Sequence, residues 1–580
     1  AYVEVEPLKG LIVKSNIGAK LAYWGSESFT PLAYFNSVSQ NSTNSFYREQ
    51  NKGLIWNFDN TIAYSRNFDK HSFGLLGGVS AYSEGQTYLN TTYRNLPINT
   101  FKEASMNYSV AVADKVGGGG EAVKHSVSSM FARLNYNYSE KYLFTGIIRK
   151  DGSTRFGSNN KYGYFPSASV GWVPSLENFW PSNNVVNFLK VRGSYGVTGN
   201  DNIGDFKYLA TVSGGRNYTI GQDSLRIGYS PNASANPSLR WEQTTQTNIG
   251  FEATVLRNIN VTFDIYDKKT TGILQDIDIP AYVGTGKPAG NVADMENRGV
   301  ELELGYHKQI GEVNFSMKGN VSYLQNRVTY LGMGKKYLDG GATVQSTAYS
   351  ISRTAVGHAI GSFYGFQTLG IFQNQQEINS YTNKEGTVIQ PNAAPGDFRF
   401  ADLDGNGKID ANDRKFIGDP TPNWSFGVTL NAAWKGFDFL IFGQGVAGND
   451  VYQGLRRLDI GNANWSTKAM SRWTGEGTSN SFPRLITSDP NKNFSNPSNF
   501  QLESGAYFRI KTMQIGYTIP KALVSKANLN RVRIYIGSNN LYTFTRYSGF
   551  DPEIGGSSYG IDRGYYPQAR SFMAGLNVGF

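Results

Sequence analysis

One short acidic segment offers the clearest potential for chemistry in this sequence. It reads DLDGNGKIDAND and runs from residue 402 to residue 413. Its oxygen-bearing side chains and its glycine fall on the spacing of calcium-binding loops, in which a hard cation is surrounded by about six to eight oxygens. The segment therefore predicts one bound Ca²⁺ that stiffens a loop. The predicted ligands are Asp402, Asp404, Asn406, the backbone carbonyl of Lys408, Asp410 and Asp413.

The same segment also fits a loop that holds no metal. The last position of the pattern is Asp413 where a glutamate is usual, which predicts binding through one oxygen and a lower affinity. No helical pattern flanks the segment. Gly407 would permit the sharp turn, and Ile409 would anchor the loop in apolar contacts. The alternative is an acidic turn in which backbone N–H groups donate hydrogen bonds to the carboxylates.

The remaining composition argues against catalysis. The sequence has no cysteine, which excludes disulfides, cysteine-ligated zinc, iron–sulfur clusters and thiol nucleophiles. The histidines His71, His125, His307 and His358 show no metal-ligand spacing, and no G-x-S-x-G motif appears. The net charge of +10 is spread over isolated Lys and Arg side chains without a basic run. We therefore predict neither an enzyme nor a nucleic-acid-binding protein.

Alternation of apolar and polar residues is the dominant pattern of the chain. Leu54, Trp56 and Phe58 alternate with polar residues such as Asn57 and Asp59. This two-residue period is typical of a strand with one apolar and one polar face. We predict about sixteen strands, many of them roughly 10 to 15 residues long, against about 5 to 6 in soluble sheets. They cover residues 10–24, 54–67, 71–83, 126–138, 142–152, 162–174, 186–197, 240–255, 258–272, 298–307, 313–325, 424–434, 437–446, 506–518, 531–544 and 568–580.

The connections between these strands alternate between tight turns and long loops. The segment 67–71 is a tight turn, whereas 325–424 is a long connection. Short turns on one side and long loops on the other are typical of outer-membrane barrels. No apolar run is long enough for a transmembrane helix. The predicted fold is all-β, a transmembrane antiparallel β-barrel in outer-membrane lipid, with short periplasmic turns and long extracellular loops. The glycine run at 117–120 is predicted to be a flexible loop tip.

Six longer stretches carry a more specific signal. They are IIRKDGSTRFGSNNKYGYFPSASVGW (147–172), LKVRGSYGVTGN (189–200), LRWEQTTQTNIGFEA (239–253), MENRGVELEL (295–304), GDFRFADLDGNGKIDANDRKFIGDPTPNWSFG (396–427) and RVRIYIGSNNLYTFTRYSGFDPEI (531–554). In this order, and over almost the whole chain, they resemble the SusC/RagA family. These proteins are TonB-dependent outer-membrane transporters of Bacteroidetes.

This resemblance implies a barrel of about 22 strands around an N-terminal plug. It also implies a SusD-like lipoprotein over the mouth and energy from TonB–ExbB–ExbD, transmitted through a short TonB box. The implied cargo is oligosaccharide or, less often, oligopeptide. The sequence departs from the family at its start, where we find no TonB box, plug or leading carboxypeptidase-like domain. Residues 1–580 are therefore expected to be the C-terminal part of such a barrel, with the calcium-loop-like insertion at 402–413.

Aromatic residues in the predicted long loops are the candidate cargo contacts. Sugar rings present apolar C–H faces that stack on aromatic rings, while their hydroxyl groups need polar neighbours. The alternative role of each ring is loop packing or a place in the outer aromatic girdle. The candidates are Tyr452, Trp465, Trp473, Tyr542, Tyr547, Phe550, Tyr559 and Tyr566.

Three functions fit a β-rich envelope protein of this kind. The resemblance favours an active importer that receives cargo from a lid-like lipoprotein. The first alternative is a passive porin made of the predicted strands, about sixteen in number. The second is a secreted β-rich binding or adhesion protein, since soluble antiparallel sheets show the same alternation.

Overall fold

Two compact units make up the computed structural model of this chain. Unit 1 comprises Ala1–Gly171, Ser194–Thr245 and Thr270–Val292, and unit 2 comprises Trp172–Gly193, Gln246–Lys269 and Ala293–Phe580. No helix among the described residues is long and apolar enough to cross a membrane. A sheet of 17 strands dominates the architecture. The described residues are 1–37, 39–181, 185–221, 224–277, 279–332, 334–340, 347–458, 463–554 and 559–580.

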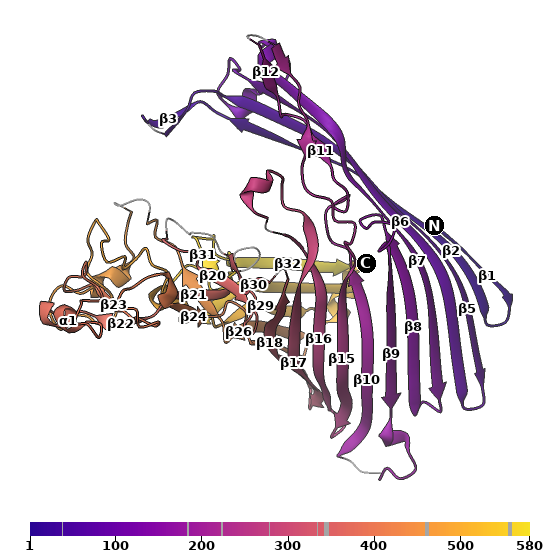
Figure 1. Cartoon of the computed structure of the whole chain (residues 1–580). Helices are drawn as coiled ribbons and strands as arrows, with labels where there is room; N and C mark the ends of the chain where they lie inside the picture. Colours follow the sequence, from indigo (N-terminus) through magenta and orange to yellow (C-terminus); the bar gives the residue numbers. More distant parts are fainter. Residues whose placement is uncertain are drawn as a thin grey trace. The chain divides into compact units, whose positions relative to one another are not determined.

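Long neighbouring strands joined by tight hairpins form the sheet in unit 1 (Figure 1). From β1 to β8 each main-sheet strand pairs antiparallel with the next. β5 and β6 are connected by Asp69 and Lys70 alone, and Asp69 has a φ of 51°, as tight hairpin turns require. The main strands are β1 (Tyr2–Leu8), β2 (Leu11–Thr30), β5 (Ser45–Phe68), β6 (His71–Arg94), β7 (Lys115–Tyr138), β8 (Tyr142–Ser153) and β9 (Tyr162–Trp172). The short strands are β3 (Ala33–Asn36), β4 (Ser39–Asn41), β11 (Val212–Ser213), β12 (Tyr218–Ile220), β13 (Ser224–Arg226) and β14 (Ser230–Pro231).

Unit 2 continues the antiparallel pattern with longer connections. From β17 to β32 each main-sheet strand pairs antiparallel with the next. The strands are β17 (Ala289–Ile310), β18 (Val313–Leu331), β25 (Trp424–Trp434), β26 (Phe437–Ala447), β29 (Tyr507–Thr518), β30 (Arg531–Thr545) and β32 (Ser571–Gly579). Three further main-sheet strands each contribute residues to both units: β10 (Val186–Asn200), β15 (Glu242–Val255) and β16 (Ile259–Asp276).

All sixteen predicted strands are confirmed, because each overlaps one strand of the main sheet. The seventeenth, β1, was not predicted. It is only 7 residues long and contains Pro7, a residue that is depleted in strands. Single-chain bacterial barrels have an even number of antiparallel strands. An odd set therefore does not fit the alternative of a sixteen-stranded porin.

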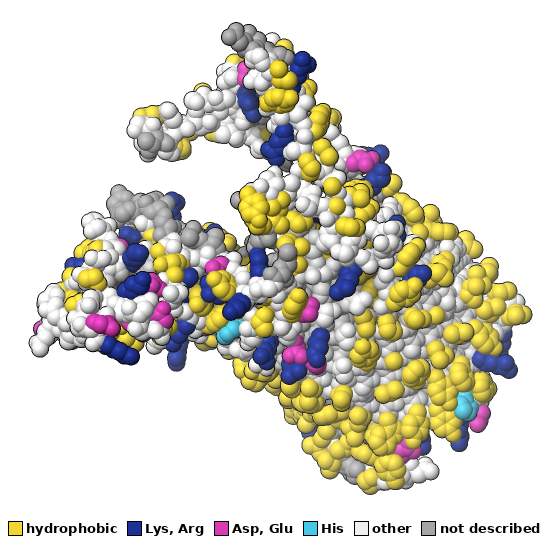
Figure 2. Space-filling view, viewed as in Figure 1, with side chains coloured by type: hydrophobic (Ala, Val, Ile, Leu, Met, Phe, Trp, Pro, Cys, Tyr) yellow, Lys and Arg dark blue, Asp and Glu magenta, His cyan; other side chains and the backbone are white. Residues whose placement is uncertain are grey.

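The two faces of the strands differ in chemistry, as the alternation predicts. On β5, Leu54, Phe58 and Ile62 are exposed along one face. On the opposite face, the carboxylate of Asp59 accepts hydrogen bonds from Ser80 Oγ at 2.5 Å and Asn57 Nδ2 at 2.7 Å. Hydrophobic side chains spread widely over the strands on the face shown in Figure 2. An exposed apolar face of this extent is the surface that a bilayer covers.

A cluster of aromatic rings surrounds the β5–β6 turn. The rings of Phe68 and His71 stack with centroids 5.4 Å apart, and Phe73 lies 4.7 Å from Tyr136. Tyr138 adds a further contact, with its centroid 4.9 Å from that of His71. Amphipathic rings gather where hydrocarbon meets headgroups. This cluster therefore marks one edge of the apolar band of unit 1.

The glycine run at 117–120 is not a loop tip, so that prediction was wrong. These residues lie within β7 and pair with Tyr88–Thr91 of β6. A Cβ built on Gly119 would lie 2.9 Å from the carbonyl oxygen of Tyr88, closer than side chains normally approach. The run therefore serves a close strand contact. Composition alone does not distinguish this use of glycine from flexibility.

A charge placed on the apolar face of β5 tests which face meets lipid. We expect Phe58→Arg to lower the free energy of unfolding by about 2–4 kcal/mol in lipid, because an arginine near the bilayer centre loses its hydration. The measurement is urea unfolding in phospholipid vesicles. Thr61→Arg, on the opposite face, is the control and should cost less than about 1 kcal/mol. Equal losses for the two variants would contradict the assignment of the faces.

Candidate functional site

Two long connections of unit 2 are folded rather than extended loops. The first joins β18 to β25 and the second joins β26 to β29, where β27 pairs with β28 and, in parallel, with β31. The first contains β19 (Tyr337–Gly340), β20 (Ser352–Ala355), β21 (Ser362–Phe366), β22 (Thr368–Ile371), α1 (Gln375–Ser380), β23 (Phe398–Phe400) and β24 (Arg414–Gly418). The other short elements are β27 (Asp450–Gln453), β28 (Leu502–Ser504), α2 (Lys521–Val524) and β31 (Ile561–Asp562).

Two apolar clusters hold these connections together. The Tyr452 cluster consists of Ile351, Phe363, Tyr452 and Ile561. The Phe398 cluster consists of Phe366, Ile371, Phe398 and Phe400. Each cluster joins segments that are far apart in the sequence, so the outer region of unit 2 has hydrophobic cores of its own.

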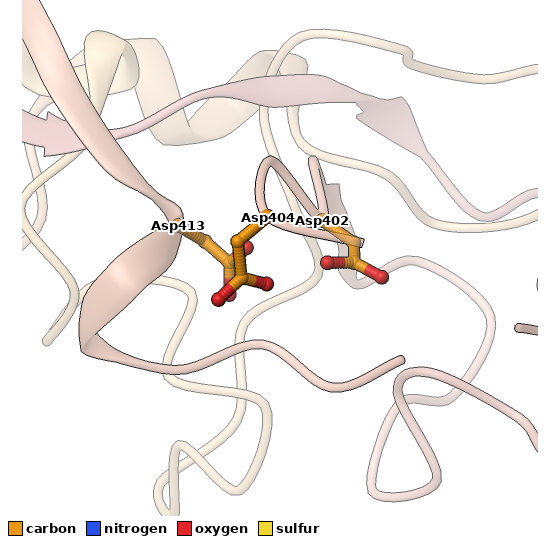
Figure 3. Close-up of side chains that lie close together, drawn as sticks. All are labelled: Asp402, Asp404 and Asp413. Carbon is orange, nitrogen blue, oxygen red and sulfur yellow. The ribbon is translucent and has the colours of Figure 1, made fainter. Parts of the chain in front are cut away.

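The acidic segment begins two residues after β23, beside the Phe398 cluster. Ile409 packs against that cluster, which confirms the predicted anchoring. Asp402, Asp404 and Asp413 each offer a carboxylate oxygen, and these three oxygens lie within 4.8 Å of one another. Figure 3 shows the three side chains in the loop. Three of the six predicted ligands are therefore brought together.

Backbone N–H groups of the same loop donate hydrogen bonds to these carboxylates. Asp402 accepts from Gly407 at 2.9 Å, and Asp413 accepts from Leu403 and from Asp410, both at 2.7 Å. These are the bonds of the metal-free alternative. A carboxylate has about four lone-pair positions, so one bond to each oxygen leaves capacity for a cation. The hydrogen bonds are therefore compatible with either arrangement.

The other predicted ligands are engaged with one another. The Oδ2 atom of Asp410 accepts a hydrogen bond from Asn406 Nδ2 at 3.2 Å and lies 3.3 Å from Lys408 Nζ. A backbone hydrogen bond from Asn412 is the main cause of the lowered pKa of Asp410. These residues consequently surround the three gathered carboxylates without adding a fourth carboxylate to them.

Charge balance at Asp413 favours a cation. This side chain is fully buried, and its burial raises the pKa of the carboxyl group. Within the described part of the chain, Asp402, Asp404 and Asp413 form no ion pair with Lys or Arg. Neighbouring carboxylates repel one another, and a divalent ion removes that repulsion. The donor set therefore fits a hard cation that completes its shell with carbonyl oxygens or water.

A second feature is a pair of adjoining pockets beside β27 and β28. The first has a volume of about 360 Å³ and the second about 240 Å³. They share a wall formed by Arg456, Leu458, Trp465 and Phe494. Volumes of this size lie near the lower end of ligand sites, which begin at roughly 300 Å³. The aromatic lining of the first pocket consists of Tyr452, Trp465, Phe482, Phe494, Phe500 and Phe550.

The shared wall is built around Trp465. The guanidinium carbon of Arg456 lies 3.8 Å from the centroid of a Trp465 ring, and Phe494 contacts the indole edge-on at 4.8 Å. Phe500 contacts Phe398 at 5.0 Å and thereby links the pocket to the Phe398 cluster. These ring contacts fix the indole and keep the two pockets apart.

Three of the eight predicted cargo residues meet at the first pocket. Tyr452 is buried but lines it, Trp465 lies between the two pockets, and Phe550 is 70% exposed. Residues far apart in the sequence thus contribute to one hollow. The pocket contains aromatic rings, as the sequence predicts, but only a subset of the candidates.

The other five candidates lie elsewhere. Trp473 packs against the Phe398 cluster and donates to Gln373 Oε1 at 3.2 Å, and the hydroxyl of Tyr547 donates to Asp562 at 2.6 Å. Burial raises the pKa of Tyr547. These two rings serve loop packing, the alternative given above. Tyr542 contacts Phe544 on β30, and Tyr559 and Tyr566 are exposed away from both pockets.

Sequence reasoning missed the phenylalanines of the pocket. Phe482, Phe494 and Phe500 stand in NSFPRLITSDPNKNFSNPSNFQ, a stretch rich in Asn, Ser and Pro. Large apolar residues isolated in such a stretch were the available signal, because a solvated loop has no use for them. Their partners come from other segments, so spacing could not show that they meet.

A serine and a histidine also meet in unit 1. His125 Nε2 lies 3.3 Å from Ser153 Oγ and 2.8 Å from Asp201 Oδ2. Ser153 is fully buried, so a substrate cannot reach its hydroxyl. Beside it, Arg155 Nε lies 2.9 Å from Asp205 Oδ1. The group is therefore a buried polar network that joins strands to a loop.

Substitution of Gly407 tests the geometry of the acidic loop. Gly407 has a φ of 81°, and a Cβ there would lie 2.5 Å from Asn383 Nδ2. We expect Gly407→Ala to increase proteolytic cleavage between residues 383 and 413. Gly405→Ala is the matched control, because its φ is 71° and nothing lies within 4 Å of its Cβ. Both variants carry a backbone cost of about 1–2 kcal/mol, so only a greater sensitivity of Gly407→Ala supports the steric contact.

Comparisons with known proteins agree with this architecture. The family model for the TonB dependent receptor-like β-barrel matches residues 13–541. TonB-dependent receptor P3 of Formosa agariphila is 30% identical over 603 residues, which cover 100% of this chain and 57% of that protein. SusC of Bacteroides thetaiotaomicron is 29% identical over 473 residues, covering 79% and 44% respectively.

Solved structures give the same result for the fold. A structure of the RagAB peptide transporter matches with a TM-score of 0.83 at 23% identity, over 100% of this chain and 61% of that chain. The matched relatives are named as receptors and transporters. The chain spans 57% of the length of the Formosa receptor. On its sequence and its wall of antiparallel strands, this chain belongs to the TonB-dependent receptor family, as an outer-membrane β-barrel of the SusC/RagA type.

Proposed function

We propose that this chain forms the wall and outer loops of a nutrient importer in the outer membrane. The observation that carries the proposal is the family match over residues 13–541, together with a sheet whose apolar face is exposed along its strands. In this proposal TonB–ExbB–ExbD supplies the energy and a SusD-like lipoprotein delivers the cargo. The similarity to SusC supports this choice of lipoprotein partner. Transport is an activity of the whole protein, of which this chain is a part in the proposal.

The cargo in this proposal is an oligomer captured outside the membrane. Oligosaccharide is the first candidate and oligopeptide the second, and RagAB is described as a peptide transporter. The folded connections of unit 2 supply the pocket beside β27 and β28, on the side of the sheet that carries long loops. Aromatic walls suit the apolar faces of either kind of cargo. A hollow at this end of the strands supports capture before passage.

We also propose that the acidic loop binds Ca²⁺ as a structural ion. Asp402, Asp404 and Asp413 would hold it, and the ion would supply charge neutralisation and cross-link the two ends of the loop. Ile409 connects the loop to the Phe398 cluster, so stiffening would extend to that cluster.

Uptake by a deletion strain tests the importer. We expect loss of the gene to abolish growth on at least one defined glycan or peptide, and loss of TonB to have the same effect. The measurement is growth and uptake of labelled oligomers, with a monomeric nutrient as the control. Uptake that persists without TonB but still requires this gene would indicate a passive pore instead.

Calcium titration tests the metal site. Ca²⁺ at about 100 times its dissociation constant should stabilise the loop by about 2.7 kcal/mol, measured as protection from proteolysis relative to EDTA. Asp404→Asn should remove the protection. Glu385→Gln removes one exposed carboxylate nearby and should not. Equal protection in both variants would contradict the site.

The pH dependence of this protection follows from Asp413. Burial raises its pKa, so the neutral carboxyl group contributes stability at low pH, and that contribution is lost as pH rises through the raised pKa. Calcium needs the ionised form. We therefore expect protection by Ca²⁺ to be full at neutral pH and to decline as pH falls through the raised pKa. Protection that stays constant across this range would exclude Asp413 as a ligand.

A further inference from the structure

We propose that the two adjoining pockets beside β27 and β28 bind uncharged apolar side chains of a peptide, two residues apart in an extended segment. This inference rests on the proposed importer function and selects its cargo class. It is carried by the apolar lining of the first pocket, by the state of its polar side chains, and by the wall that the two pockets share.

The lining of the first pocket is dominated by rings that offer no hydrogen bond. Phe482, Phe494, Phe500 and Phe550 are hydrocarbon throughout, and Leu458 adds an aliphatic side. Burial of an apolar group against such a surface is favourable in proportion to the area removed from water. A sugar ring would present hydroxyl groups to the same walls.

The polar side chains at this pocket are already engaged. The carboxylate of Glu503 accepts hydrogen bonds from Lys468 Nζ at 2.6 Å, Gln453 Nε2 at 2.9 Å and Ser548 Oγ at 2.7 Å. The side-chain amide of Gln501 bonds to backbone carbonyls of its own segment. Hydroxyl groups buried here would lack partners, which disfavours a glycan relative to an apolar side chain.

Charges around the pockets balance. Arg456 and Lys468 are the basic side chains of the lining, and Glu503 and Asp489 are the acidic ones. Asp489 accepts hydrogen bonds from the backbone N–H groups of its own segment, with Asn493 N at 2.7 Å. A charged occupant would lose hydration without an unmatched opposite charge to compensate it. The balance therefore favours an uncharged side chain.

The shared wall accounts for the choice of an extended peptide. Both pockets are bounded by Arg456, Leu458, Trp465 and Phe494, so their occupants lie on either side of the Trp465 ring. Alternate side chains of an extended chain point to the same face and are separated by roughly 6–7 Å. Side chains two residues apart can enter both pockets together, whereas adjacent side chains point to opposite faces.

Calorimetry on the protein purified from outer membranes tests the proposal. The probes are blocked peptides with two phenylalanines in a serine background, placed either two residues apart or next to each other. An all-serine peptide and a neutral glucose hexamer are the comparisons. We expect the spaced peptide to bind at least about tenfold more tightly than the adjacent and all-serine peptides, with a negative heat-capacity change.

Two variants locate the binding. Phe550→Asn removes an exposed ring of the first pocket without disturbing a buried core, and it should weaken the spaced peptide about tenfold. Tyr566→Asn removes a ring that is 90% exposed outside both pockets and should leave the affinity unchanged. Leu458→Asn, in the shared wall, should abolish the advantage of the spaced peptide over the adjacent one.

Several results would overturn this inference. They are equal binding of the spaced and all-serine peptides, displacement of the spaced peptide by the glucose hexamer, and an unchanged affinity in Phe550→Asn. Failure here is distinguishable from failure of the importer. If the peptides do not bind but the deletion strain loses glycan uptake, the importer stands and the peptide assignment falls. If the spaced peptide binds as expected but no uptake depends on the gene, the reverse holds.

Discussion

Backbone hydrogen bonding in hydrocarbon is the constraint on which this structure depends. Inside a bilayer no water is available to a peptide N–H or C=O group, so each strand must pair along its full length. The antiparallel ladder from β1 to β8, and that from β17 to β32, meet this requirement through strands of up to 24 residues. Once the ladder is fixed, the two-residue period assigns every side chain to one face. The apolar face then has hydrocarbon as its solvent, and Asp59 and its partners line the other.

The same constraint separates the wall from the region that carries specificity. Turns at one end can be short because they only reverse the chain, as Asp69 and Lys70 do. Connections at the other end are free to grow, and in unit 2 they build small sheets around the Tyr452 and Phe398 clusters. Ile409 and Phe500 both contact the Phe398 cluster. The acidic loop and the aromatic pocket are therefore supported by one hydrophobic core.

Much of the wall could be predicted from the sequence because strand faces depend on local alternation. Leu54, Phe58 and Ile62 reveal their face without knowledge of any partner strand. The acidic loop was also local, and its anchoring by Ile409 followed from spacing alone. Asn406 and Asp410 behaved differently, because Lys408 draws Asp410 into an ion pair that the template does not contain. The pocket could be predicted only in part. Trp465 and Phe550 signal binding by type, but nothing local reveals that Phe494 meets Trp465 or that Tyr547 is bound to Asp562.

The central claim is that the apolar face of this sheet contacts lipid, and spin labelling along β5 tests it most directly. The sequence has no cysteine, so single substitutions such as Phe58→Cys or Asp59→Cys can each be labelled without background. In lipid vesicles, the account predicts that collisions with oxygen, which dissolves in hydrocarbon, peak at residues 54, 56, 58 and 62. Collisions with a water-soluble nickel complex should peak at the residues between them. Labels that all reach the nickel complex, without a two-residue period, would contradict the account.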